Sequence, residues 1–358
     1  MKKSFERKVL ENLEPYKYIK AEYKIKLDAN ESQFNLSDKV RERLCKYITG
    51  EFNANFYPNS DCDLLRDTIA KHYGLKSENI VVGAGSDQII DIIYKAFLNQ
   101  GDRVVVPYPT FSMYELTAKV YEGTPVRVKI ASNGGYEYAV SKFIDTIKNE
   151  KAKIAFICTP NSPTGNTMSL KEIRQVIEAC PDTLIVVDEA YGEFTNQTAI
   201  SLVNEYNNLI ILKTFSKAYG LAAARVGYSV SCNETADSLN KVKPPYNVAA
   251  LSQIMAQYVL DDVEESGKRI KDIVLQRNSL FEELKKIQGV KVFPSEANFL
   301  LIKVEDSQKA YKALLDNGIV AINFGDKEDL ENCMRISVGL DWQNKLILDS
   351  LRLIKEGN

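Results

Sequence analysis

The stretch LIILKTFSK, residues 209–217, shows most clearly the pattern from which the fold can be predicted. Its first six residues form a mostly apolar run of strand length, and the polar groups of Ser216 and Lys217 follow at once. A run without polar alternation is typical of a parallel strand that helices cover on both faces. Ligands bind beyond the carboxyl ends of such strands, so the sequence places Lys217 where a ligand is expected.

Six more apolar runs of this kind lie between residues 79 and 231. Gly, Pro or Asp bound them, and segments with helical spacing separate most of them. Strands that alternate with helices predict an α/β fold with a largely parallel, doubly wound sheet and helices on both faces. Seven strands are expected in all, at 79–83, 103–107, 126–130, 154–159, 184–188, 209–214 and 225–231.

The pattern changes after Pro244-Pro245 and predicts a smaller α+β domain. Residues 247–287 have helical spacing, strand-like runs follow at 290–293, 298–304 and 334–338, and a last helix is expected from Trp342. The chain therefore divides into an N-terminal segment (1–35), a large domain (36–245) and a small C-terminal domain (246–358). The N-terminal segment is polar and rich in tyrosine, and we expect it to pack against the small domain or a partner subunit.

Composition argues against several classes of protein. The 358 residues are 45% hydrophobic and 26% charged, with a formal net charge of -2 and no stripe of Lys or Arg. Small molecules are therefore favoured over nucleic acid as partners. The six cysteines are scattered without a C-x-x-C pair, which favours reduced thiols over disulfides or a metal site. The N-terminus has no signal-like apolar region and no segment has the length of a membrane span, so we expect a soluble, cytoplasmic protein.

Polar residues follow four of the predicted strands, and each group alone has an ordinary explanation. Asp188-Glu189 could hold magnesium in a nucleotide hydrolase, but the chain contains no G-x-x-x-x-G-K-[ST] motif. Gly83-x-Gly85 resembles half of a dinucleotide fingerprint, but Gln88 stands where the third glycine belongs. Residues 161–165, Asn-Ser-Pro-Thr-Gly, favour a turn wherever they occur. A single lysine after a strand is usually an exposed charge.

Together, the four groups match what a pyridoxal-phosphate site requires. The cofactor needs a lysine amine that can act as nucleophile and base, and a buried carboxylate that keeps its ring nitrogen protonated. It also needs a donor to its phenolic oxygen, and a helix N-terminus with hydroxyl groups and an arginine for its phosphate. Lys217, Asp188 and Arg225 provide three of these groups at strand ends.

The order of these motifs resembles the fold-type I, class I and II aminotransferases, and within them the histidinol-phosphate branch. The resemblance covers nearly the whole chain, from Asn12-Leu13-Glu14-Pro15-Tyr16 and Leu27-Asp28-Ala29-Asn30-Glu31 to Met334-Arg335-Ile336-Ser337-Val338-Gly339. It implies pyridoxal 5'-phosphate as cofactor, small-molecule amino donors and acceptors, and a homodimer. The activity it implies is amino transfer between L-histidinol phosphate and 2-oxoglutarate, which gives imidazole acetol phosphate and L-glutamate in histidine biosynthesis.

The resemblance also assigns roles to individual residues. Lys217 corresponds to the lysine that holds the cofactor as a Schiff base and acts as catalytic acid and base, and Asp188 to the partner of the ring nitrogen. Asn161 and Tyr191 correspond to partners of the ring oxygen, and Tyr191 is also counted as catalytic. Phe111 takes the place of a tyrosine that stacks on the cofactor ring, a role that its own ring can fill.

The remaining assignments concern the cofactor phosphate and the substrate. Ser86, Asp87, Ser216 and Arg225 correspond to the phosphate site. Tyr57 matches a tyrosine that reaches the neighbouring subunit's site, which implies shared active sites. Substrate binding is assigned to Arg335, Tyr16, Asn161 and Tyr57, of which Arg335 would grip a substrate anion through its planar fork. No metal is expected, and the lone histidine, His72, is expected at the surface or in packing.

One position departs from the resemblance. The family commonly has a valine-arginine pair whose arginine grips the substrate phosphate, and here Ile322 stands at the arginine's place. A lost charge-assisted bond to phosphate costs on the order of 1.5 to 3 kcal/mol. An aromatic or broad-specificity aminotransferase and a threonine-phosphate decarboxylase therefore stay open as alternatives. A cofactor-sensing regulator is a further alternative, but it would need a basic DNA-binding domain for which the chain has no room.

Overall fold

The structure is a computed structural model that describes residues 5–11, 13, 22–132 and 134–356. Its main feature is a sheet of seven strands in the order β2-β10-β9-β8-β7-β3-β4. Each strand overlaps one of the seven predicted runs, which confirms the predicted sheet. The strands are β2 (Ile80–Gly83), β3 (Arg103–Tyr108), β4 (Thr124–Lys129), β7 (Ile154–Cys158), β8 (Leu184–Asp188), β9 (Leu209–Thr214) and β10 (Gly227–Ser231).

The sheet is parallel except at one strand. Strands β9, β8, β7, β3 and β4 pair in parallel, whereas β10 runs antiparallel to both of its neighbours, β9 and β2. An antiparallel strand begins at the edge where its parallel neighbours end. Residues that precede β10 therefore lie beside residues that follow β9 and β2.

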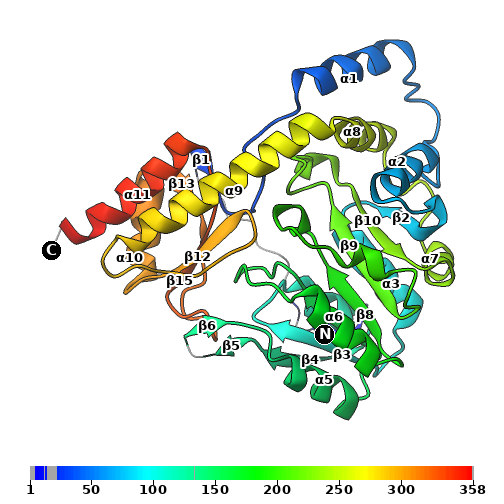
Figure 1. Ribbon diagram of the computed structural model, residues 1–358, viewed down its shortest axis with the longest axis horizontal. Helices are drawn as coiled ribbons and strands as arrows, with labels where there is room; N and C mark the ends of the chain where they lie inside the picture. The colour runs from blue at the N-terminus through cyan, green and yellow to red at the C-terminus, as the bar shows by residue number, and fades with distance from the viewer. Residues whose placement is uncertain (1–4, 12, 14–21, 133, 357–358) are drawn as a thin grey trace.

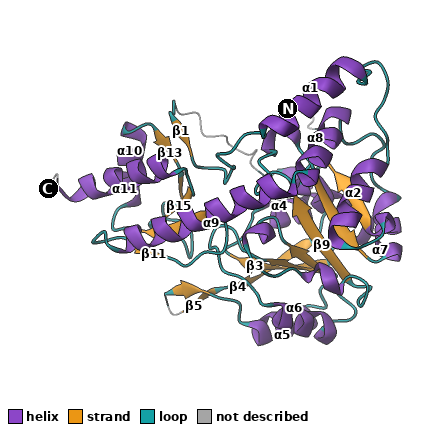
Figure 2. Ribbon diagram, turned by 45° about the horizontal axis from the view of Figure 1, so that its top comes forward, coloured by secondary structure: helices purple, strands orange, loops and turns teal. Residues whose placement is uncertain are grey.

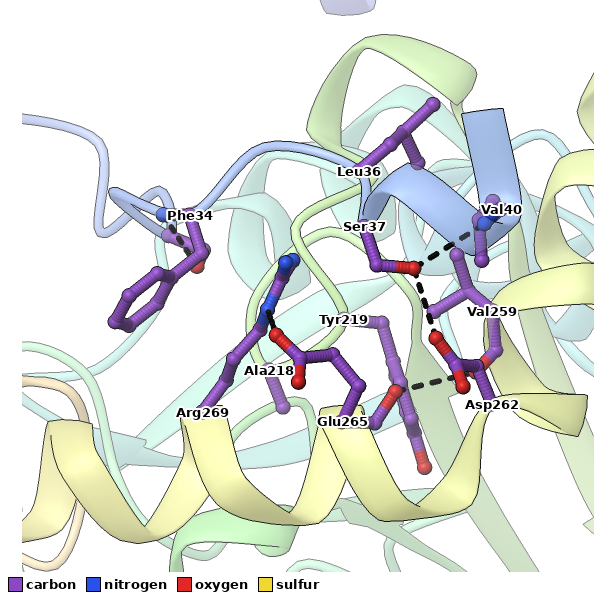
Figure 3. A pocket seen from close by; sticks show the side chains of 12 residues that line it. Phe34, Leu36, Ser37, Val40, Ala218, Tyr219, Val259, Asp262, Glu265 and Arg269 are labelled. Atoms are coloured by element: carbon purple, nitrogen blue, oxygen red, sulfur yellow. Dashed lines mark hydrogen bonds and ion pairs between the residues drawn. The ribbon is translucent and has the colours of Figure 1, made fainter. Parts of the chain in front are cut away.

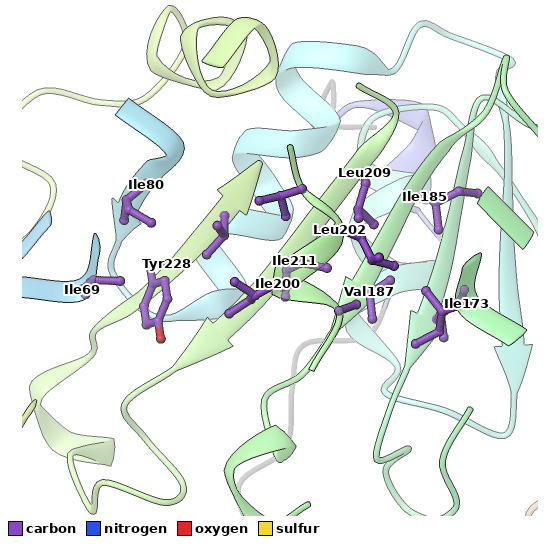
Figure 4. Packing of buried hydrophobic residues seen from close by; sticks show 14 of the residues in the cluster. Ile69, Ile80, Ile173, Ile185, Val187, Ile200, Leu202, Leu209, Ile211 and Tyr228 are labelled. Carbon is purple, nitrogen blue, oxygen red and sulfur yellow. The ribbon is translucent and has the colours of Figure 1, made fainter. Parts of the chain in front are cut away.

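Helices cover both faces of this sheet (Figure 1). Alternate residues of each strand point to opposite faces, and they enter two separate cores: Ile185 and Val187 lie in one, and Val186 in the other. Figure 4 shows part of the first core, where Tyr228 lies near Ile69 and Ile211 lies near Val187. Burial on both faces explains why the strands read as continuous apolar runs.

Each core has its own helices. Buried residues of α2 (Asp63–Tyr73), α5 (Val140–Asn149), α6 (Leu170–Ala179) and α8 (Ala250–Asp261) belong to the first core. Those of α3 (Ser86–Phe97), α4 (Met113–Val120) and α7 (Asn233–Asn240) belong to the second. The start of α6 shows how the sequence sets a helix end, because Ser169 and Glu172 form a reciprocal capping box.

The C-terminal part of the chain forms the expected α+β unit. Its antiparallel sheet has the order β11-β12-β15-β14. The strands are β11 (Lys291–Val292), β12 (Phe299–Lys303), β14 (Ile322–Asn323) and β15 (Cys333–Ser337), and the helices are α9 (Val263–Lys285), α10 (Ser307–Asp316) and α11 (Asp341–Glu356). The sequence predicted β11, β12, β15 and α11 but missed the two-residue strand β14 and helix α10.

Part of the N-terminal segment completes this unit. Strand β1 (Ile25–Lys26) pairs in parallel with β13 (Ile319–Val320). Ile25 and Leu27 are buried in one core with Leu284 and Ile336. The expectation that this segment packs against the C-terminal domain is therefore met by β1. Helix α1 (Asp38–Gly50) follows and contacts α8.

The helical region predicted at 247–287 is two helices, α8 and α9, which meet at Asp262. Helix α8 packs on the large sheet's side, where Ala256 and Leu260 join the first core, whereas Leu280 and Leu284 of α9 lie in the C-terminal core. Helix α9 thus runs from one half of the molecule to the other (Figure 2). The division of the chain at residue 245 stays a prediction. Within the described residues, no helix is long and apolar enough to cross a membrane.

Candidate active site

The predicted site residues come from neighbouring strand ends at one edge of the large sheet. Asp188 is the last residue of β8, and Ser216 and Lys217 follow β9. Asn161 follows β7, whose last residue is the register partner of Asp188. Arg225 precedes β10 and reaches the same edge because that strand is antiparallel. The fold thus brings together residues that are up to 64 positions apart in the sequence.

Asp188 is a carboxylate buried in the protein, with 3% of its surface exposed. Its Oδ2 accepts a hydrogen bond from the Tyr114 hydroxyl at 2.6 Å, and its Oδ1 accepts one from the Ala190 N–H at 2.9 Å. Burial raises the pKa of Asp188 to about 6, although both hydrogen bonds oppose the rise. Such a carboxylate is poised to bind a cation, because a positive partner would remove the cost of ionising it.

Lys217 is half-buried beside Asp188's strand. Its Nζ donates a hydrogen bond to the carbonyl oxygen of Ala29 at 2.7 Å and lies 5.7 Å from the centre of the Tyr191 ring. Two groups from distant parts of the chain therefore position the amine. Lys217 and Tyr191, both predicted for the site, therefore lie close together, and their roles stay predictions.

The stretch LIILKTFSK contains a second lysine, which the structure uses differently. Lys213 is buried, and its Nζ lies 2.8 Å from Glu193 Oε1 and 3.3 Å from Glu189 Oε2. Burial alone would lower the pKa of Lys213, but the two glutamates, with Tyr73, raise it well above its ordinary value. A lysine held in its protonated form is no nucleophile, so Lys213 serves as a structural cation.

Residues 28–30 form a strap that contacts three predicted site residues in succession. The carbonyl oxygen of Asp28 accepts a hydrogen bond from Arg335 Nη2 at 2.5 Å, and that of Ala29 accepts the Lys217 bond. Asn30 Nδ2 donates to the Tyr191 hydroxyl at 2.9 Å. The strap therefore joins the large sheet to strand β15, which carries Arg335.

Asn30 is the anchor of this strap. It is buried, its backbone is left-handed (φ 53°), and its N–H donates to Ser337 Oγ at 2.9 Å. Its carbonyl oxygen accepts a hydrogen bond from Asn298 at 3.0 Å. Asparagine tolerates the left-handed region better than most residues. Asn30 lies in the motif of residues 27–31, but no role was predicted for it, because nothing local to the motif indicates these contacts.

Arg335 also contacts the large domain. Its Nη1 donates to Ser162 Oγ at 3.0 Å, and its guanidinium carbon lies 5.5 Å from the centre of the Phe299 ring. Ile322 of β14 is the register partner of Arg335 and is half-buried. An apolar side chain thus stands directly across the strand pair from the predicted anion-binding arginine.

An anion-binding arrangement lies at the start of α3. Ser86 is the first residue of this helix, whose N-terminal N–H groups favour negative charge. Arg225 Nη1 lies 3.4 Å from Ser216 Oγ, and Arg225 Nη2 forms an ion pair with Asp87 at 3.2 Å. The four residues predicted for the cofactor phosphate are therefore together.

Two glycines make this close approach possible. A Cβ on Gly85, which has φ +82°, would lie 2.6 Å from Arg225 Nη2. A Cβ on Gly227 would lie 2.3 Å from the Ser86 nitrogen. A side chain at either position would push the guanidinium or strand β10 away from the helix start.

Asn161 and Phe111 border the site from β7 and β3. Asn161 is fully buried, and its Nδ2 donates to Pro109 O at 2.9 Å and to Thr164 Oγ1 at 2.6 Å. Its Oδ1 accepts a hydrogen bond from Thr110 at 2.6 Å. One of the Nδ2 partners must give way if Asn161 is to bond a cofactor oxygen. Phe111 is half-buried and meets the Tyr114 ring edge-on, with ring centres 5.6 Å apart.

Tyr57 stands apart from the other predicted residues. It is 81% exposed, and its ring stacks on that of Tyr246 with centres 4.6 Å apart. Neighbouring Phe56 is 71% exposed. Among the described residues, Tyr57 contacts the ring of Tyr246 and none of the other predicted site residues, and its service to a partner subunit stays a prediction. Tyr16, the other predicted substrate residue, lies outside the described residues.

A small cavity lies behind the segment that follows Lys217. Figure 3 shows Ala218 and Tyr219 among the residues that line it, together with Ser37 and Asp262, whose side chains are in contact. Ser37 Oγ donates to Asp262 Oδ2 at 2.8 Å. This bond joins the start of α1 to the junction of α8 and α9. The chain is thus held by the contact of Ala29 with Lys217 and again, eight residues later, by the contact of Ser37 with Asp262.

These side chains fit pyridoxal phosphate by their chemistry. Asp188 can hold a protonated ring nitrogen, Lys217 offers an amine, Phe111 offers a ring for stacking, and Ser216 with Arg225 can hold a phosphate. No group of three or more His, Cys, Asp or Glu side chains in the described part of the chain is arranged to hold a metal ion. The carboxylate of Asp188, the amine of Lys217 and the fork of Arg225 are donors that suit an organic cofactor with a basic nitrogen and a phosphate.

Known proteins are similar to this chain in sequence and in fold. A family model described as "Aminotransferase class I and II" matches residues 22–350. The histidinol-phosphate aminotransferase of Ruminiclostridium cellulolyticum is 42% identical over 340 residues, which are 95% of this chain and 95% of that protein.

Two solved structures show the fold. The histidinol-phosphate aminotransferase of Sinorhizobium meliloti, in complex with pyridoxal-5'-phosphate, has a TM-score of 0.84 at 23% identity and covers 93% of this chain and 91% of its own. The L-threonine-O-3-phosphate decarboxylase of Porphyromonas gingivalis has a TM-score of 0.78 at 23% identity and covers 93% and 99%. These neighbours confirm the predicted fold class.

Replacing Asp188 with asparagine tests the electrostatics of the site in the ligand-free protein. The raised pKa of Asp188 means that the native state holds its proton up to about pH 6, whereas the unfolded state releases it near pH 3.8. Wild-type stability should therefore fall, as pH rises through 4 to 6, by up to about 3 kcal/mol relative to Asp188→Asn. Urea unfolding at pH 4, 6 and 7.5 measures this difference.

Asp237→Asn provides the matched control, because Asp237 is exposed on α7. This variant should follow the wild type at every pH. Parallel pH dependences for Asp188→Asn and the wild type would contradict the account of the buried carboxylate.

Proposed function

Because the chain belongs to the class I and II aminotransferase family, we propose that it is a pyridoxal-phosphate enzyme acting on L-histidinol phosphate and 2-oxoglutarate. The products are imidazole acetol phosphate and L-glutamate, and the step belongs to histidine biosynthesis. One observation carries the proposal: buried Asp188 and the amine of Lys217 lie at adjacent strand ends, beside the anion-binding arrangement of Ser216 and Arg225. The name of the 42% identical relative supports the choice of substrate.

Each part of the site has a task in this reaction. Pyridoxal phosphate, when bound, supplies an aldehyde that accepts the amino group and a ring that withdraws electrons. Lys217 Nζ would hold the cofactor covalently, and the same amine would serve as the base and acid for the proton on the substrate carbon. The Asp188 carboxylate holds the proton on the ring nitrogen, because separating that ion pair in a buried site is costly. Tyr191 and Asn161 direct hydrogen bonds to the ring oxygen.

The chain also has groups to orient the substrate and exclude water. Arg335 offers a fork that can turn from Ser162 and the Asp28 carbonyl to the carboxylate of glutamate or to an anionic group of the other substrate. Phe111 covers one side of the cofactor ring. The strap at residues 28–30 lies over the lysine and limits access of solvent to it.

We further propose a homodimer in the cytoplasm. The exposed aromatic residues Phe56, Tyr57 and Tyr246 support a second copy of the chain as partner, because aromatic side chains are enriched at protein interfaces. Tyr57 would reach the partner subunit's site. Sedimentation equilibrium measures the mass directly, and a monomeric holoenzyme would exclude this role for Tyr57. Free thiols at all six cysteines suit a reducing compartment.

The substrate is tested by spectroscopy on the holoenzyme. Histidinol phosphate should convert the lysine-bound cofactor to its amino form, with loss of visible absorption, and 2-oxoglutarate should not. Subsequent addition of imidazole acetol phosphate should restore the spectrum. Phenylalanine and threonine phosphate serve as comparisons: faster conversion by phenylalanine would favour an aromatic aminotransferase, and release of carbon dioxide from threonine phosphate would favour the decarboxylase.

Ile322 gives a second test of the substrate. An arginine at this position would stand beside Arg335 and could bind the substrate phosphate. Ile322→Arg should lower the KM for histidinol phosphate about tenfold, the effect of one charge-assisted bond, and leave the KM for phenylalanine within about threefold. Steady-state kinetics on both substrates measures this. An unchanged KM for histidinol phosphate would mean that the phosphate binds elsewhere.

A further inference from the structure

Tyr114 is a buried residue that no prediction assigned to the site. It lies in the first turn of α4 and has no exposed surface. Its ring stacks on Phe156, with centres 4.4 Å apart, and meets the edge of Phe111 at 5.6 Å. Its hydroxyl lies 2.6 Å from Asp188 Oδ2. The tyrosine thus connects the residue expected to stack on the cofactor with the residue expected to bind its nitrogen.

Tyr114 is the one side-chain donor to Asp188 among the residues that the structure describes. The other donor is the Ala190 N–H, to Oδ1. The neighbouring charged groups, Asp87 and Glu189, disfavour ionisation of Asp188, as does burial itself. The buried thiol of Cys158 is adjacent on β7 and adds no positive charge. The hydroxyl of Tyr114 is therefore the side chain that favours the ionised form.

The packing around Tyr114 restricts where its hydroxyl can point. The ring stacks on that of Phe156 and meets the edge of Phe111, so two aromatic side chains limit its movement. A hydroxyl whose position is restricted in this way fixes the position of Asp188 Oδ2. The orientation of the carboxylate plane is thereby fixed as well. A hydrogen bond to a charged group is about twice as strong as one between neutral groups.

Resting on the proposed function, we propose that Tyr114 is a positioning residue that acts through Asp188. Its hydroxyl holds the carboxylate ionised and oriented, so that the remaining lone pairs of Asp188 face the ring nitrogen of the cofactor. A carboxylate that loses this donor binds a proton more tightly and can rotate. The proton shared with the ring nitrogen then moves toward the carboxylate, and the ring withdraws electrons less strongly.

Tyr114→Phe tests the proposal, because it keeps the ring and removes the hydroxyl. The variant should bind pyridoxal phosphate about 10-fold more weakly, and its kcat should fall about 10- to 100-fold while KM changes less than about threefold. The visible absorption of the bound cofactor should change with pH at a higher midpoint than in the wild type, because the ring nitrogen carries less positive charge. Absorbance titration of the holoenzyme and cofactor titration of the apoenzyme measure these effects.

Tyr94→Phe is the matched control. Tyr94 is also fully buried, packs near Phe156 with ring centres 5.7 Å apart, and bonds a backbone carbonyl instead of Asp188. It should keep the wild-type midpoint and kcat, so a general loss of packing is separated from a loss at Asp188. If Tyr114→Phe behaves like Tyr94→Phe, the inference is overturned while the proposed function stands. If the wild type binds no pyridoxal phosphate, the proposed function fails and the inference fails with it.

Discussion

The rest of this site depends on one carboxylate, Asp188, which is buried at the end of a parallel strand and is stable as an anion only with hydrogen-bond donors or a cation beside it. Asp188 is expensive to ionise where it lies, and burial raises its pKa to about 6. Two hydrogen-bond donors, the Tyr114 hydroxyl and the Ala190 N–H, oppose this rise in pKa. The lysine of the next strand then lies at the same edge. In the proposed function, the ring nitrogen of the cofactor would be the counter-ion of this buried carboxylate.

Two features of topology bring the remaining groups to Asp188. The antiparallel strand β10 begins at the edge where its neighbour β9 ends. Arg225, which precedes β10, therefore lies beside Ser216 and the start of α3. The strap at residues 28–30 starts from the C-terminal unit, where β1 pairs with β13, and reaches Lys217 and Tyr191. The site therefore depends on both halves of the molecule. A movement of one half relative to the other would change the positions of Lys217 and Arg335 together, because residues 28–30 contact both.

The sequence predicted what local patterns determine and missed what distant contacts determine. The central strands, such as β7 and β8, were found because burial on both faces leaves continuous runs of apolar residues. The direction of β10 was not predicted, since an antiparallel strand carries no pattern of its own. Asn30 and Tyr114 were missed as members of the site because their partners, Tyr191 and Asp188, lie 161 and 74 positions away. The break at Asp262 was missed because helical spacing continues across it. The domain limits and the roles of the site residues stay predictions.

The proposed function requires that the amine of Lys217, and no other amine, carries the cofactor. Borohydride reduction of the holoenzyme, followed by proteolysis and mass spectrometry, measures this most directly. Lys213 is the sharpest internal comparison, because it lies four residues away and is held protonated between Glu189 and Glu193. The account predicts one modified peptide, labelled at Lys217, with Lys213 unmodified. Labelling at Lys213 or at another lysine, or no stable label at all, would contradict it.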